Sequence, residues 1–296
     1  MALLRLASAS EGRAVLVAED DFTRSLGSFD RSFRMRTTAP VEDAALREFL
    51  GEQAVDFTAE EAAVWEEAIA TLARGAQGIG RFLPPEVLVV KTTGREERDH
   101  AYTRANAIVL PAARAGGLRG ERAYRLLAHE LFHVASRTAP ALRDATYALL
   151  GFSSVGPIEP PAELDDKRMT NPDAHALGHY VRLGERAFVP LLVCPLPLAD
   201  VLDRTSVVSI VNTTLLAIDP DAGTVVRDAA GAPVLVDAGA TEWARRIGRN
   251  SSYTLHPEEV LADNLSLVVR RRLGTAPHVA DPAFLTAFEE IVADGS

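Results

Sequence analysis

The sequence has a single cysteine, Cys194, and no long uninterrupted run of apolar residues. One cysteine cannot form an intrachain disulfide, so nothing in the chain requires an oxidising compartment. The longest apolar stretch, residues 188–202, is cut by prolines and is shorter than a membrane span requires. Charged residues interrupt the short apolar run at the N-terminus, which makes it a poor signal peptide. We expect a soluble, cytoplasmic protein without a membrane span.

Positive charge is also scarce. The chain has 31 Lys and Arg against 41 Asp and Glu, which gives a net charge of −10, and it contains no basic run. Nucleic acids and anionic membranes are bound by basic surfaces, so neither is expected as the main partner. Hydrophobic residues make up 47% of the chain, which is enough for a sizeable core. The oligomeric state stays open.

The hydrophobic periodicity predicts an α+β fold without regular βαβ alternation. Expected helices lie at residues 41–73, 120–137, 257–272 and 282–293, and expected strands at 84–94, 101–111 and, in several pieces, 176–237. Residues 28–37 are interpreted as a strand or a surface arm, and residues 151–176, rich in Pro, Gly and Asp, as a loop. In that loop, Asn-Pro-Asp at 171–173 either shapes a cleft or only turns the chain.

Histidine is rare, with 7 in 296 residues, yet two histidines stand four apart in His129-Glu130-x-x-His133. On a helix these two rings project from one face, while the apolar stripe of the same helix lies almost opposite. A lone buried histidine is more often a core residue than a ligand. A chance match to this motif in such a chain has odds on the order of one in a hundred. The motif therefore predicts a metal site, and two imidazoles with a carboxylate favour Zn²⁺ with a fourth position open.

The predicted third ligand is Glu259, on the expected helix 257–272. Asp263 lies one turn later on the same face, and we expect it to hydrogen-bond the far nitrogen of the ligand histidine His129. The alternative third ligands are Glu258, which has no carboxylate four residues on, His256, and the pair His175 and His179, which enters an extended segment. The alternative explanation for Glu259 and Asp263 is a solvated helix face near the positive end of the helix dipole.

His129-Glu130-x-x-His133 followed by Glu259-x-x-x-Asp263 resembles the gluzincin metallopeptidases, the thermolysin-like group. Residues 259–263, "EVLAD", are similar to the Glu-x-x-Ala-Asp pattern of the CAAX-prenyl endopeptidase relatives. The resemblance implies one zincin-like domain over residues 1–296. Its parts would be a helical N-terminal region, a small mixed sheet over the histidine helix with residues 101–111 at its edge, a β-rich insertion at about 151–255, and a C-terminal helix that carries the glutamate ligand. The insertion makes the interval between the motifs far longer than in thermolysin, and membrane helices like those of the CAAX endopeptidases are lacking.

The resemblance implies a zinc-dependent metallopeptidase in which Glu130 activates a zinc-bound water that attacks a peptide or protein substrate. A further donor must stabilise the tetrahedral oxygen. Tyr253, just before the expected helix 257–272, is the first candidate, and His175, His179 and Tyr180 are the others. Another zinc amidase or hydrolase with the same site is an alternative function, as is an inactive, zinc-stabilised interaction module. The presence of Glu130 favours chemistry, because a purely structural site has no use for a base beside the water.

Overall fold

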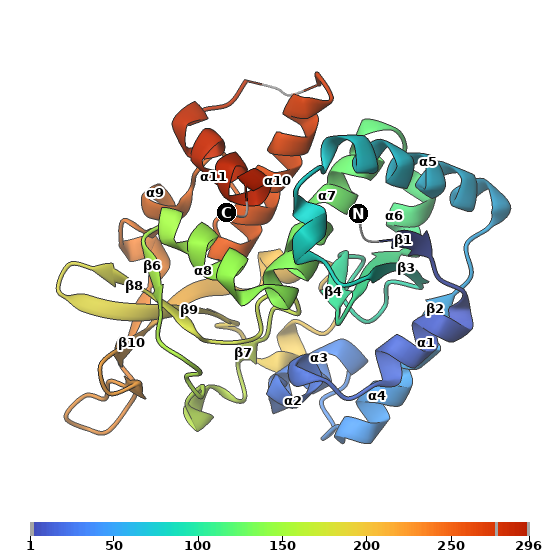
Figure 1. Ribbon diagram of the computed structural model, residues 1–296. Helices are drawn as coiled ribbons and strands as arrows, with labels where there is room; N and C mark the ends of the chain where they lie inside the picture. The colour runs from blue at the N-terminus through green and yellow to red at the C-terminus, as the bar shows by residue number, and fades with distance from the viewer. Residues whose placement is uncertain (1–2, 276–277, 295–296) are drawn as a thin grey trace.

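The structure is a computed structural model that describes residues 3–275 and 278–294. Two β-sheets lie on opposite sides of the view in Figure 1, with helices α7 and α10 between them. The helices longer than eight residues are α1 (Ala9–Val17), α4 (Asp43–Glu52), α5 (Ala59–Gly75), α7 (Glu121–Thr138), α8 (Pro140–Leu149), α10 (Pro257–Arg272) and α11 (Pro282–Asp294). The shorter ones are α2 (Asp21–Ser25), α3 (Ser28–Met35), α6 (Ala112–Gly117) and α9 (Trp243–Ile247). Among the described residues, no helix is both long and apolar enough to cross a membrane.

The first sheet is mixed and packs against α7. Its strands are β1 (Leu3–Leu6), β2 (Ala54–Val55), β3 (Glu86–Thr92), β4 (Tyr102–Arg104) and β5 (Ala107–Pro111). The order is β1-β3-β5-β4, with β1, β3 and β5 parallel and β4 antiparallel at the edge. Successive side chains of a strand point to opposite faces. Val87 and Val89 accordingly join the core cluster of α5 and α7, whereas Leu88 and Val90 pack on the other face with Val15 of α1.

The second sheet is antiparallel throughout. Its strands are β6 (Phe152–Ser154), β7 (Arg168–Met169), β8 (His179–Leu183), β9 (Arg186–Val193), β10 (Asn212–Asp219), β11 (Thr224–Val225) and β12 (Leu235–Asp237). The order is β11-β10-β9-β8-β6, with β7 beside β9 and β12 beside β10. Phe188 and Leu215 belong to the same core cluster as the apolar face of α7, while Val189 and Leu191 form a separate cluster on the other face. The largest core cluster therefore contains side chains from both sheets.

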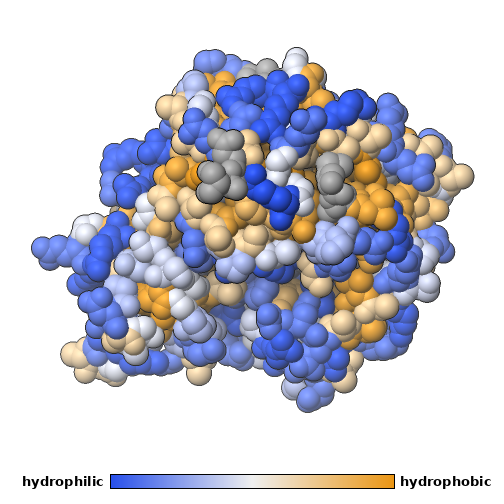
Figure 2. Space-filling model, in the orientation of Figure 1, coloured by the Kyte–Doolittle hydropathy of each residue, from blue (hydrophilic) through white to orange (hydrophobic). Residues whose placement is uncertain are grey.

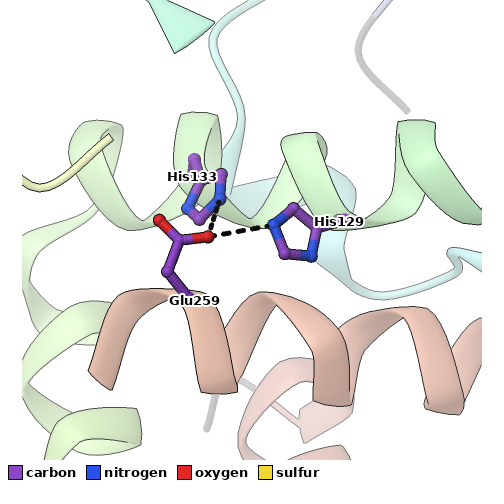
Figure 3. Close-up of side chains that lie close together, drawn as sticks. All are labelled: His129, His133 and Glu259. Carbon is purple, nitrogen blue, oxygen red and sulfur yellow. Dashed lines mark hydrogen bonds and ion pairs between the residues drawn. The ribbon is translucent and has the colours of Figure 1, made fainter. Parts of the chain in front are cut away.

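Helices α7 and α10 lie side by side (Figures 1 and 3). Gly120 precedes α7 with φ +53°, a conformation that glycine adopts without a steric penalty. Pro257 occupies the first turn of α10, where its missing N–H leaves no hydrogen bond unmade, and His256 caps the helix by accepting a hydrogen bond from Glu258 N. Ser266 of α10 donates to the Arg125 carbonyl of α7 over 3.0 Å. These two helices carry both of the predicted motifs.

Four interpretations from the sequence are wrong. Residues 41–73, expected to be helical throughout, form α4 and α5 with the short strand β2 between them. Residues 28–37, expected as a strand or surface arm, contain helix α3, whose Asp30 and Arg34 form a buried ion pair of 2.8 Å. The buried face of this helix carries polar as well as apolar side chains, so it is not a continuous apolar stripe. The expected strand 101–111 is two strands, β4 and β5, joined by a turn at Ala105, which has φ +48°. Residues 151–176 are not loop throughout, because they contain β6 and β7.

Candidate metal centre

The two motif helices bring three potential ligands together. His129 and His133 project from one face of α7, one turn apart, and Glu259 faces them from α10 (Figure 3). Glu259 Oε2 lies 3.2 Å from His129 Nε2 and 3.7 Å from His133 Nε2. The ligand atoms of the three residues lie within 4.8 Å of one another, so these residues could hold a metal ion. The sequence predicts the histidine pair on one helix and the carboxylate of Glu259 on another. In the structure these groups meet at one point.

Each of these three side chains is held by a further hydrogen bond on its far side. Asp263 Oδ1 lies 3.1 Å from His129 Nδ1, which is the contact expected from the sequence. Glu258 Oε1 lies 3.2 Å from His133 Nδ1, and Asn171 Nδ2 donates to Glu259 Oε1 over 2.7 Å. Such contacts fix the tautomer of a ligand histidine and raise its basicity. Both Nε2 atoms and Glu259 Oε2 are therefore directed toward the common centre.

Two of the residues considered as alternative third ligands, Glu258 and His256, have other roles in the structure. Glu258 lies behind His133, on the side of its ring away from Glu259, and also accepts hydrogen bonds from Ser136 and Tyr147 over 3.1 and 2.9 Å. His256 is the cap of α10. Glu258 is thus a positioning residue for His133, a role that the sequence does not reveal.

The hydrogen bonding of His133 gives independent support for a metal ion between these three residues. His133 is 1% exposed, and its buried Nε2 atom has no hydrogen-bond partner among the described residues. A buried polar nitrogen without a partner is costly, and a cation at the common centre would satisfy it. A second possible group, formed by Glu130, His133 and Asp173, overlaps the first at His133. It contributes one imidazole only, whereas the first group contributes two, so we assign the centre to the first group.

The three ligands shift one another's ionisation. Burial raises the pKa of Glu259, but the nearby imidazoles outweigh it and lower this pKa to about 2. Burial lowers the pKa of His133, yet the carboxylates of Asp173 and Glu259 raise it to about 9. Burial likewise opposes the charged form of His129, but hydrogen bonds to Asp263 and Glu259 hold its pKa well above the ordinary value. The site therefore favours positive charge at its centre, in the form of either protons or a cation.

Glu130 is buried beside this centre. Its Oε2 atom has no hydrogen-bond partner among the described residues, and its pKa is raised to about 7 by burial and by the carboxylate of Asp173. Asp173 is held in place by Thr103 of the edge strand β4, through its N–H at 2.8 Å and its hydroxyl at 2.6 Å. A carboxylate whose pKa lies near 7 can both accept and return a proton at neutral pH.

A cavity of about 430 Å³ opens onto the site and is lined by His129, Glu130 and Glu259. Tyr253 also lines it, and burial together with the charge of Glu259 raises the pKa of this phenol, which keeps it protonated. Asn171, Pro172 and Asp173 are part of the lining, so the Asn-Pro-Asp turn shapes this cavity.

The other candidate donors lie elsewhere. His175 and His179 line a separate cavity of about 270 Å³, and Tyr180 packs against the core cluster of the second sheet. His100, which the sequence did not single out, lines the main cavity at the end of the charged loop before β4.

Comparisons with known proteins found no matching family model, no matching curated protein and no matching solved structure.

Proposed function

We propose that this protein is a zinc-dependent metallopeptidase of the gluzincin type. The observation that carries the proposal is the meeting of His129 Nε2, His133 Nε2 and Glu259 Oε2 at one point, with each of the three side chains fixed from behind. Two imidazoles and one carboxylate are typical of catalytic zinc sites, which leave one position open. The adjoining cavity leaves room for a substrate on that side. The edge strand β4, the histidine helix α7 and the glutamate helix α10 support this proposal.

The chain's own residues have distinct roles in this reaction. Zinc, when bound, supplies a Lewis acid that polarises a carbonyl and makes water more acidic. Glu130 accepts a proton from the attacking water as the new C–O bond forms, and returns it to the amine nitrogen as the C–N bond breaks. Tyr253 donates a hydrogen bond from its hydroxyl to the oxygen that gains negative charge.

The test combines metal content with turnover. Purified wild-type protein, supplied with Zn²⁺, should cleave peptides in a proteome-derived mixture, with the new termini identified by mass spectrometry. Glu130→Gln should keep the metal and lose turnover, because glutamine fills the same space but accepts no proton. The matched control is Glu67→Gln on α5, an exposed carboxylate outside the cavity. Retained turnover in Glu130→Gln would remove this mechanism. Metal binding without turnover by wild type would leave a zinc-stabilised interaction module instead.

A further inference from the structure

The cavity beside the metal centre has a basic rim formed by three arginines, Arg114 of α6 and Arg122 and Arg125 of α7. All three are exposed. Arg122 and Arg125 make no ion pair and no side-chain hydrogen bond among the described residues, and Arg114 reaches only the carbonyl of Asp99, over 3.4 Å. Their charges are therefore available to a ligand.

Unpaired arginines are conspicuous in a chain with a net charge of −10. Nearby basic residues do have partners: Arg34 contacts Glu97 at the cavity wall, and Arg270 contacts Glu121 at the start of α7. Arg122 also lies in the first turn of α7, where the helix dipole disfavours a cation. The positive charge of Arg122 is therefore not explained by a contribution to the stability of α7.

The arginines of α7 are in register with the metal centre. Arg122, Arg125 and His129 are spaced by three and four residues, so they follow one face of the helix. At ~1.5 Å of rise per residue, Arg125 lies about 6 Å and Arg122 about 10 Å along the axis from His129. An extended peptide advances ~3.3 Å per residue, so these distances correspond to about two to three residues from the scissile bond. Apolar side chains line the same cavity, namely Leu118, Leu126, Val207, Val208 and Val211.

We infer that the substrate is an acidic peptide, with a carboxylate two to three residues from the cleaved bond bound by Arg122 and Arg125. This inference rests on the proposed peptidase function. Arg114 adds positive charge at the mouth of the cavity, where a neighbouring groove that shares His100, Arg114 and Leu118 continues over the surface. The carboxylate belongs either to an internal Asp or Glu or to the peptide's C-terminus, and the guanidinium groups recognise both in the same way.

The binding experiment does not need turnover. Zinc-loaded Glu130→Gln protein is titrated with three fluorescein-labelled peptides of otherwise identical Ala- and Leu-rich sequence, and anisotropy is measured. One peptide contains Glu and an amidated C-terminus, one contains Gln and an amidated C-terminus, and one contains Gln and a free C-terminus. We expect the Glu peptide to bind about tenfold more tightly than the amidated Gln peptide, with a preference that weakens in salt. Tighter binding of the free-terminus peptide instead would identify the chain end as the source of the carboxylate.

The double substitution Arg122→Gln and Arg125→Gln should abolish this preference. The control is Arg74→Gln with Arg245→Gln, which removes the same charge at exposed positions outside the cavity and should leave the preference unchanged. Equal binding of all peptides, or a preference that survives loss of both rim arginines, would overturn the inference. Cleavage by wild type is measured separately. Cleavage without a preference for acidic residues would contradict the rim assignment alone, whereas an acidic preference without cleavage would contradict the peptidase function alone.

Discussion

Asp263 reaches His129 Nδ1 at 3.1 Å from the same face of α10 on which Glu259 Oε2 approaches His129 Nε2 at 3.2 Å. One helix thus contacts both nitrogens of one ring. Because the two carboxylates are four residues apart, a single turn of helix supplies the candidate ligand Glu259 and also Asp263, which orients the candidate ligand His129. His133 receives the corresponding contact from Glu258, which adjoins Glu259 in sequence but lies on the other side of the ring.

This arrangement predicts how the metal affinity responds to substitution. Asp263→Asn and Glu258→Gln remove a negative charge while keeping an acceptor oxygen near the ring, so we expect each to weaken zinc binding about 10- to 100-fold. His133→Ala and Glu259→Ala should weaken it much further, because each removes a ligand. The affinity is measured by competition with a zinc-binding dye, and exposed Glu67→Gln serves as control. An unchanged affinity in both Asp263→Asn and Glu258→Gln would contradict the roles given to these carboxylates.

Metal binding should also release protons. The pKa of His133 is raised to about 9 and that of His129 well above its ordinary value. In the metal-free protein both rings are therefore in the charged imidazolium form near neutral pH. A metal ion requires the neutral ring, and we expect about two protons to be released per zinc ion at neutral pH. The apparent affinity should therefore rise as the pH increases from neutrality toward 9. Calorimetry in buffers of different ionisation enthalpy counts the protons, and a binding heat that is independent of the buffer would argue against this charge state.

The sequence predicted the two motif helices closely for physical reasons. Residues 120–137 and 257–272 have strong local signals, namely a helical apolar stripe in the first and Pro257 at the first turn of the second, and the structure places α7 at 121–138 and α10 at 257–272. Local signals failed for α3, because its inward face carries the ion pair of Asp30 and Arg34 instead of an unbroken apolar stripe.

The contacts of Glu258 and Asn171 with the candidate ligands show a different limit of prediction from sequence. Whether Glu258 or Glu259 faces the metal centre depends on how α10 is rotated against α7, and this rotation is set by packing between segments far apart in the chain. The spacing to Asp263 favoured Glu259, but nothing local indicates that Glu258 would reach His133 from behind. Asn171 was likewise visible only as part of a turn, and its hydrogen bond to Glu259 spans 88 residues of sequence.

Tyr253 provides a prediction about the chemical step. If its hydroxyl stabilises the developing oxyanion, Tyr253→Phe should lower kcat about 100-fold with little change in KM, since the interaction strengthens only in the transition state. Zinc content should stay the same, because the tyrosine is not among the ligands. Tyr180→Phe is the matched control, as Tyr180 packs in the second sheet away from this cavity. A rise in KM alone would instead assign Tyr253 to substrate binding.

The cap of α10 links the stability of the fold to pH. His256 is buried, and burial outweighs the attraction of Glu258 and Glu259, so its pKa is lowered from 6.5 to about 4. Between these two values the unfolded chain binds more protons at this residue than the folded one does. The stability that His256 contributes is therefore present above about pH 6.5 and is lost as the pH falls toward 4, by up to about 3 kcal/mol. His256→Asn supplies a comparison, because asparagine also caps helices but does not titrate in this range. The difference in unfolding free energy between wild type and His256→Asn, from denaturant titrations in the presence of zinc, should grow in favour of wild type as the pH rises from 4 to 6.5 and then level off. A difference that stays constant across this window would show that His256 holds its proton equally in the folded and unfolded chains.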